Sequence, residues 1–327
     1  MKTIRIIQLV ILLLVIVILA AVLVVGLLGR LPVTFAGVFG NLASVDSVMV
    51  FDRQYNGSGL NKIDADLSTA SIEFEFSQDD ELRVVYYGPE KEINNPTIDI
   101  DYDEIQLNIN QANRFGFFNN IINERVIVYL PADFSSEIIC KTASGNIKMN
   151  DNMILNKLEM SVSSGNISMQ DIDVLNLKIN LSSGGISADE MLLEQYGIKV
   201  SSGNVKLNSL KGTGDIKTTS GSISIDSYEG SGLLKSTSGN VNLGLKMLTD
   251  DLDIELTSGG ANIRILQSAP DFSCDFDVVS GSIRTNFGDV DDEIAGASFD
   301  YDFIDDANNK LRIKTTSGNL KVEHVSS

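Results

Sequence analysis

The sequence predicts an all-β protein: a single-stack β-solenoid of about 18–20 residues per coil, preceded by one N-terminal transmembrane helix. Three observations support this prediction. A Ser-Gly pair recurs at nearly constant spacing, apolar and polar residues alternate on both sides of each pair, and a long uncharged apolar stretch lies near the N-terminus.

Nine Ser-Gly pairs follow one another from Ser144 to Ser317, at intervals of 18 to 22 residues and a last interval of 37. Periods near 20 residues are typical of solenoids, in which each unit buries its apolar face only by stacking on its neighbours. The last interval is close to two periods and predicts one unmarked coil between Ser280 and Ser317. The expected corner glycines are Gly145, Gly165, Gly184, Gly203, Gly221, Gly239, Gly259, Gly281 and Gly318.

Side-chain alternation predicts two strands per coil. Around the second pair, Leu158, Met160 and Val162 precede the corner, and Ile167 and Met169 follow it. Alternation with a period of two residues indicates strands with one buried face. Across the Ser-Gly pair the inward residues change from even-numbered to odd-numbered positions. The chain must therefore bend there, and glycine is the residue that turns a corner at positive φ without a Cβ clash.

The organisation along the chain follows from these patterns. "LSTASIEFEF", starting at Leu67, reads as a coil that lacks its glycine, and the region before the regular train is strand-like but divergent. We expect a short cytoplasmic end (1–5), a transmembrane helix (6–28), a linker (29–45), divergent N-terminal β coils or cap (46–135), and the regular solenoid (136–327) with an acidic insert near 286–309.

The apolar stretch Ile6–Leu28 contains 23 residues without a charge. As a helix it would be about 34 Å long, enough to cross a bilayer core of about 30 Å. A cleaved signal peptide would normally have a shorter apolar region and a small-x-small cleavage site. We therefore expect a retained single-pass anchor, and Lys2 and Arg5 before it favour a cytoplasmic N-terminus with the rest outside the cytoplasm.

Composition argues against several functions. The net charge of −19 and the pI near 4.4 oppose nucleic-acid binding, which needs a basic surface. His324 is the single histidine, so neither a zinc site nor a base for the repeated serines can be assembled around histidines. We expect no enzyme activity, no catalytic or metal-binding residues and no cofactor.

The two cysteines, Cys140 and Cys274, occupy positions that the repeat points inward. They are about seven coils apart, roughly 34 Å at about 4.8 Å per coil, whereas a disulfide needs Cα atoms within about 7 Å. We predict two buried free thiols.

Several motifs together resemble a known family. "LSTASIEFEF", then "RVIVYLPADF" with Pro131, then the train of Ser-Gly units resembles the bacterial putative-adhesin family of β-solenoid surface proteins, a domain of unknown function. The resemblance runs from about Asp46 to the C-terminus. It implies a cell-envelope protein, sometimes adhesive and often linked to envelope stress, and it supplies no catalytic residues.

The outward positions beside the corner suggest a site. Nine bases lie in two columns, three residues before the serine or four after it: Lys141, Lys148, Lys199, Lys206, Lys217, Lys235, Arg284, Lys314 and Lys321. They could bind an anionic envelope polymer or lipid headgroups. The alternative is that they are ordinary solvated strand exteriors. The acidic stretches "GDVDDE" and "DYDFIDD" read as solvated loops, because neither matches a known calcium loop.

The functional expectation is a membrane-anchored surface scaffold or adhesin-like binding module of the cell envelope. The alternative is an envelope-stress regulator whose ectodomain binds a ligand and controls a separate membrane partner. The last coil carries the complete Ser-Gly pattern, and only a few residues follow it in the sequence. A bare terminal coil leaves backbone groups unpaired, so we also expect self-association or partner docking through this C-terminal coil.

Overall fold

The computed structural model describes residues 47–78, 81–112, 123–288, 294–295 and 298–325. They belong to one unit, Val45–Ser327, while Met1–Ser44 form a separate unit. The expected transmembrane segment Ile6–Leu28 and the phenylalanine-rich segment 113–122 lie outside the described residues. Within the described ranges, no helix is long and apolar enough to cross a bilayer.

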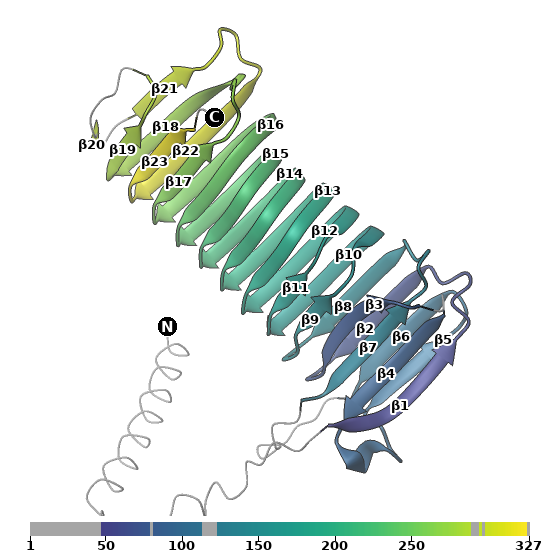
Figure 1. Cartoon of the computed structure of the whole chain (residues 1–327). Coiled ribbons are helices and arrows are strands. Elements are labelled where there is room, and N and C mark those ends of the chain that lie inside the picture. The colour runs from purple at the N-terminus through teal and green to yellow at the C-terminus, as the bar shows by residue number, and fades with distance from the viewer. Residues whose placement is uncertain (1–46, 79–80, 113–122, 289–293, 296–297, 326–327) are drawn as a thin grey trace, which may run out of the picture. The chain divides into compact units, whose positions relative to one another are not determined.

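The middle of this unit is a regular stack of two-sided coils (Figure 1). After each Ser-Gly corner the chain runs along one sheet (the post-serine sheet), bends, and returns along a second sheet (the pre-serine sheet) to the next corner. Its strands are β8 Glu137–Thr142, β9 Ile147–Met149, β10 Met153–Ser164, β11 Ile167–Met169, β12 Ile172–Ser183, β13 Ile186–Ser202, β14 Val205–Ser220, β15 Ile223–Ser238 and β16 Val241–Ser258.

Neighbouring coils pair in parallel and in register, so equivalent residues stack. Ile198 of β13, for example, lies opposite Ile179 of β12 and Ile216 of β14. The inward side chains of both sheets meet in one continuous core of buried Leu, Ile, Val, Met and aromatic residues. The predicted alternation is confirmed, because the inward positions are those that the repeat marks as apolar.

The Ser-Gly corner is held by two ladders of hydrogen bonds. The backbone N–H of Gly203 donates to the carbonyl of Ser220 in the next coil at 3.0 Å. The side-chain oxygen of Asn204 accepts from the backbone N–H of Ser222, also in the next coil, at 2.9 Å. Gly203 has φ +146°, and a Cβ on it would overlap the carbonyl oxygen of Gly184 in the previous coil. Gly203 therefore needs to be glycine both for its backbone conformation and for its close approach to the neighbouring coil. Gly145, Gly221 and Gly239 do not have positive φ, so the close approach is the requirement that all the corners share.

The coil that lacks its glycine is confirmed, with Ala70 at the corner position. Leu67 pairs with Thr142 and Ile72 with Ile147, which places this coil in register with the regular train. It consists of β2 Lys62–Leu67 and β3 Ser71–Phe76, and it lies between β8–β9 and a coil formed by β6 Gln106–Gln111 and β7 Arg125–Leu130. The first coil of the chain is thus not the outermost one.

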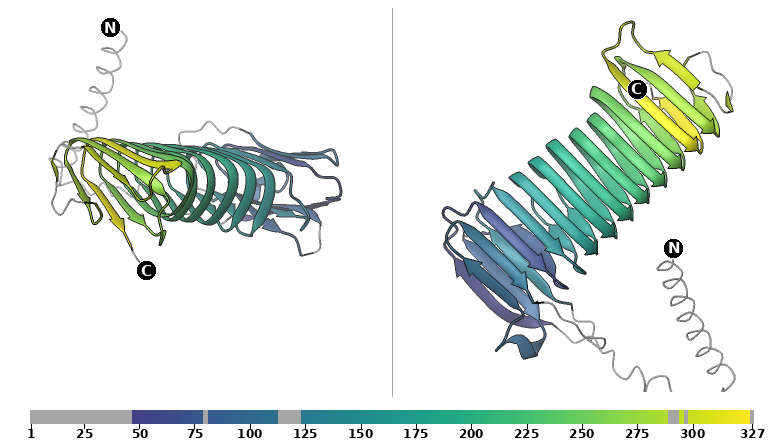
Figure 2. Two further views of the ribbon diagram at one scale, coloured as in Figure 1. Left: turned by 90° about the horizontal axis from the view of Figure 1, so that it is seen from above. Right: turned by 180° about the vertical axis from the view of Figure 1, so that it is seen from behind.

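Antiparallel strands close this end of the stack (Figure 2, purple end). They are β5 Ile98–Tyr102 on β6, β4 Leu82–Gly88 on β7 and β1 Val48–Tyr55 on β4, with the short 3-10 turn η2 Glu90–Glu92 after β4. The stack of corners ends at Ala70, where the side-chain oxygen of Gln111 accepts hydrogen bonds from the backbone N–H groups of Ser68, Thr69 and Ala70 at 2.9–3.0 Å.

The other end repeats this arrangement. Its strands are β17 Ala261–Ile265, β18 Phe272–Ser280, β19 Ser282–Thr285, β20 Ile294–Ala295, β21 Ser298–Asp302, β22 Asn309–Ser317 and β23 Leu320–His324. The last coil of the chain, β22–β23, pairs with β16–β17 on one side and with β18–β19 on the other. β21 and β20 then pair antiparallel with β18 and β19 and close the stack (Figure 1).

Three sequence expectations are wrong at this end. Ser280 and Ser317 pair directly, so the interval of 37 residues holds no unmarked coil between two stacked neighbours. The C-terminal coil is internal, so its two backbone edges are occupied and are not free to add a strand. The acidic insert is not only a loop, because β21 packs Phe299 into the core against Phe276.

Both cysteines are buried and free, as predicted. Burial raises the pKa of the Cys140 thiol and of the Cys274 thiol well above the ordinary range, which disfavours the reactive thiolate. The inserted C-terminal coil adds one rung between them. They are therefore eight rungs apart, about 38 Å at about 4.8 Å per rung.

The corner can be tested by a pair of alanine substitutions, one at the corner that follows β13 and one within β13. Gly203→Ala should lower the free energy of unfolding by roughly 2–4 kcal/mol, because the new Cβ strains the backbone and overlaps Gly184. Gly197→Ala is the control, since a Cβ there meets nothing within 4 Å. Urea unfolding measures both variants, and equal stability of the two would contradict the stacking argument.

The end of the corner stack predicts a second effect. Gln111→Leu should destabilise the protein by about 2 kcal/mol, because it leaves the buried N–H of Ala70 and its two neighbours without an acceptor. Hydrogen exchange at residues 68–70 should accelerate. Gln106→Leu, in the same strand, removes only a side-chain contact to Asn108 and should leave these amides protected.

Candidate functional site

The bases that precede the corner line up on the outer face of the pre-serine sheet. Lys199, Lys217 and Lys235 occupy consecutive rungs of β13, β14 and β15. Lys141 is separated from Lys199 by Ser161 and Asn180, while Glu255 separates Lys235 from Lys314. We call these five lysines the pre-serine column.

The bases that follow the corner lie on the other sheet. Lys148 is beside Glu73, Lys206 lies between Ser187 and Ser224, and Arg284 pairs with Lys321. The two sheets enclose one core, so their outer faces point away from each other. The nine bases that the sequence groups therefore form two columns on different faces, and they do not make one continuous surface.

The two faces differ in charge across the four central coils, residues 167–237. Their pre-serine strands carry four lysines and one aspartate: Lys178, Lys199, Lys217, Lys235 and Asp215. The remainder of the same coils, from each corner through the bend that leads into the pre-serine segment, carries seven acids and two lysines: Asp171, Asp173, Asp189, Glu190, Glu194, Asp226, Glu229, Lys206 and Lys211. An acidic protein thus presents a locally basic face along the middle of its pre-serine sheet.

Lys178 belongs to this face and was missed by the sequence argument. It lies five residues before its corner, one outward position away from the pre-serine column, so a search of every outward column would have found it.

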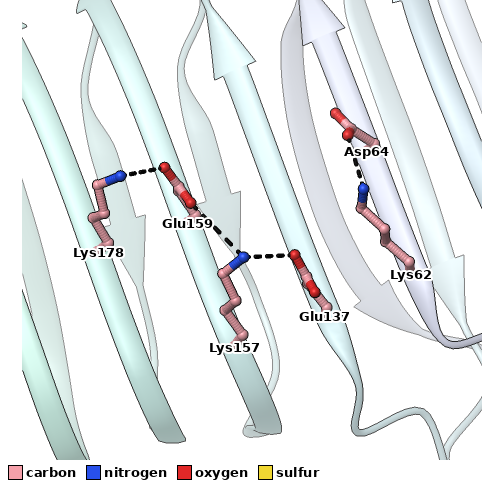
Figure 3. A network of polar contacts seen from close by, with 6 residues as sticks. All are labelled: Lys62, Asp64, Glu137, Lys157, Glu159 and Lys178. Atoms are coloured by element: carbon pink, nitrogen blue, oxygen red, sulfur yellow. Dashed lines mark hydrogen bonds and ion pairs between the residues drawn. The ribbon is translucent and has the colours of Figure 1, made fainter.

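Ion pairs between rungs neutralise part of the face. Figure 3 shows Lys157 bridging Glu137 at 2.7 Å and Glu159 at 3.9 Å, and Lys178 contacting Glu159 at 2.7 Å. Lys62 and Asp64 pair within one strand at 3.3 Å (Figure 3).

Within the pre-serine column, Lys217 contacts Asp215 at 2.6 Å and Lys235 contacts Glu255 at 2.5 Å. Lys141, Lys199 and Lys314 have no ion pair among the described residues, since Glu255, which lies opposite Lys314, contacts Lys235. These three ammonium groups are the most available to an external anion.

Small side chains between the charged ones leave shallow, open depressions on this face. One of about 360 Å³ is lined by Lys141, Ser161, Ser163 and Asn180. A second, of about 310 Å³, lies beside Lys178 and Gly197, and a third, of about 290 Å³, lies between Lys235 and Lys314. All three are lined by residues of pre-serine strands.

The single histidine is engaged in packing within the fold, and the described residues include no metal-binding cluster. His324 packs against Phe303, with its Nε2 3.0 Å from the carbonyl oxygen of Gln267. No group of three or more His, Cys, Asp or Glu side chains in the described ranges could hold a metal ion. The pre-serine face instead carries ammonium and hydroxyl groups at regular spacing, each of which can make a weak contact with a ligand.

The ion-pair ladder makes a testable pH prediction. Lys178 lowers the pKa of Glu159 in the folded protein by hydrogen bonding to its carboxylate. The stabilisation is therefore present above pH ~4.5 and is lost as the pH falls through the lowered folded pKa. Glu159→Gln should cost less than about 1 kcal/mol at pH 7, because the pair is partly exposed, and progressively less as the pH falls below about 4.5.

Lys178→Gln should reproduce this pH dependence if the pair is its cause. Unfolding curves measured between pH 3 and 7 would show it. A difference that does not change with pH would contradict the assignment.

Comparisons with known proteins agree with the geometry. The model of the family described as Toastrack DUF4097 matches residues 60–226 and 214–323. No curated protein matches the chain.

Three solved structures are similar to it. A "putative lipid binding protein" from Parabacteroides distasonis is 14% identical, covering 86% of this chain and 99% of that one, with a TM-score of 0.42. A "putative adhesin" from Bacteroides fragilis is 13% identical, covering 84% and 96%, with a TM-score of 0.41. A "putative cell adhesion protein" from Clostridium sporogenes is 14% identical, covering 85% and 100%, with a TM-score of 0.29.

None of these three is similar enough to assign a ligand to this chain. The family match covers most of the residues that form the stack, including the two inserted coils at its ends. The chain belongs to the Toastrack DUF4097 family.

Proposed function

We propose that this protein is a non-catalytic, adhesin-like binding module of the cell envelope, which binds phosphate-bearing polymers or lipid headgroups along its pre-serine face. The observation that carries this proposal is the contrast between the two faces of the central coils. Four lysines oppose one aspartate on the pre-serine strands, in a chain whose net charge is −19. A basic patch that persists in an acidic protein favours a short-range anionic ligand.

The spacing of the face suits an extended, repetitive ligand. Rungs about 4.8 Å apart place Lys199, Lys217 and Lys235 in a row. Beside them runs a column of hydroxyl groups, Ser201, Thr219 and Thr237, which can donate to phosphate oxygens. Each contact is weak at an exposed site, but contacts held on one rigid sheet reinforce one another when the ligand is a polymer.

The proposal includes the membrane anchor. Ile6–Leu28 is uncharged and long enough to span a bilayer core, and the bases before it favour a cytoplasmic N-terminus. The solenoid would then project outside the cytoplasm, from a single-pass anchor in the cell membrane. This orientation would present the pre-serine face to the polymers and lipids of the envelope.

Two triple variants test the proposal. Lys199→Gln, Lys217→Gln and Lys235→Gln together remove the central pre-serine lysines. Lys148→Gln, Lys206→Gln and Lys321→Gln together are the matched control, with the same loss of charge from the other sheet. Retention on immobilised poly(glycerol phosphate) should fall about 10-fold or more in the first variant only, since each lysine near an anionic surface contributes up to about 1 kcal/mol.

Binding to vesicles with and without anionic phosphatidylglycerol is measured in parallel. Binding to the anionic vesicles would identify lipid headgroups, rather than a polymer, as the source of the phosphate. Binding should weaken with added salt. Equal retention of the wild type and both variants, independent of salt, would remove the proposal. Co-purification with a dedicated sensor kinase would favour the regulatory alternative instead.

A further inference from the structure

The C-terminal coil, residues 309–324, fills a gap between two coils that precede it in the sequence. Its inward side chains Leu311, Ile313, Leu320 and Val322 are buried in the common core. Three of its outward side chains in the pre-serine sheet are basic, Lys310, Arg312 and Lys314, and the next one is Thr316. No other described pre-serine strand carries three outward bases.

Both walls of the gap are acidic at matching positions. On β16, Asp253 lies opposite Arg312 and Glu255 opposite Lys314. Asp251, also on β16, contacts Arg312 at 2.8 Å and accepts a hydrogen bond from the backbone N–H of Lys310.

On β18, Asp275 lies opposite Arg312 and Asp277 opposite Lys314. The inserted strand thus meets opposite charge on both sides.

The charges also explain why the chain does not stack its coils in sequence order here. If β18 followed β16 directly, Asp275 would lie beside Asp253, and Asp277 beside Glu255. Like charges directly opposite one another in a sheet are destabilising. The basic coil separates the two acidic strands and pairs with both.

We propose that the gap between β16–β17 and β18–β19 is a charge-selective binding site for a strand–turn–strand peptide, which residues 309–324 occupy as a separable segment. The ligand class is a peptide with apolar residues inward, bases outward and a Ser-Gly turn between its strands. Backbone hydrogen bonds along both edges hold it, and the acidic walls select its charge.

The connections of the segment permit separation. After β21 the chain reaches β22 through a short turn whose residues Ile304, Asp305 and Asp306 are exposed. A single cut in the turn therefore leaves the C-terminal coil held by noncovalent contacts alone.

The test uses the full chain in detergent, with a protease recognition sequence inserted between Asp306 and Ala307. After cleavage, the C-terminal fragment should remain bound through gel filtration. A fluorescent synthetic peptide of residues 307–327 should then exchange into the site, and its binding should weaken with added salt.

Charge reversal makes the test specific. A peptide with Lys310→Glu, Arg312→Glu and Lys314→Glu should bind at least about 100-fold more weakly, because like charges across an interface cost several kcal/mol. Lys321→Glu, on the post-serine strand of the same peptide, is the control and should bind within a few-fold of the native peptide. A chain with Asp251→Lys, Asp253→Lys and Glu255→Lys should recover part of the binding of the reversed peptide, because Asp275 and Asp277 on β18 still oppose its glutamates.

Two results would overturn the proposal. In the first, the cleaved fragment dissociates and the native peptide does not rebind, so that the coil is not a separable ligand. In the second, the native and reversed peptides bind equally well, so that the walls do not select charge.

Discussion

The close approach of consecutive coils at the Ser-Gly corner is the constraint on which the rest of the structure depends. Each corner glycine places its carbonyl oxygen where a Cβ of the next coil would lie, from Gly145 through Gly259 and on to Gly318 and Gly281. Coils that meet at such close range cannot slip by a residue without a steric clash. The corner therefore fixes the register, and the register aligns the inward residues into one core and the outward residues into columns.

The order of the coils, which the corner alone would leave open, matches their charges at both ends of the stack. The inserted coil near the N-terminus carries Glu73, which contacts Arg125 of one neighbour at 3.8 Å and Lys148 of the other at 3.4 Å. The inserted C-terminal coil shows the opposite pattern, with bases between acidic walls. In both places the inserted strand bears charge opposite to its two neighbours, although the charges are partly exposed and so contribute more to selectivity than to stability.

The sequence predicts most of the structure of a single coil, but little of the order in which the coils stack. Alternation around the corner is a local property, and the buried positions, the corner glycines and the coil at Ala70 all follow from it. Coil order depends on residues far apart in the chain, and spacing alone suggested an unmarked coil between Ser280 and Ser317. One signal in the sequence could have predicted the order of these coils. The acids Asp251, Asp253 and Glu255 have the same two-residue spacing as the bases Lys310, Arg312 and Lys314. The nine bases were named from the sequence as a candidate site, but their division between two faces follows from the fold.

The rigid, in-register stack holds the lysines of the proposed binding face at fixed spacing. They can therefore act together on an extended anion. Disulfide formation between engineered cysteines tests the stack most directly at its least expected point. Glu255→Cys with Lys314→Cys should oxidise readily, since the two residues lie on adjacent rungs about 4.8 Å apart. Glu255→Cys with Asp277→Cys should not, because the inserted coil separates them by two rungs. The reverse outcome, a bond between positions 255 and 277 and none between 255 and 314, would contradict the account.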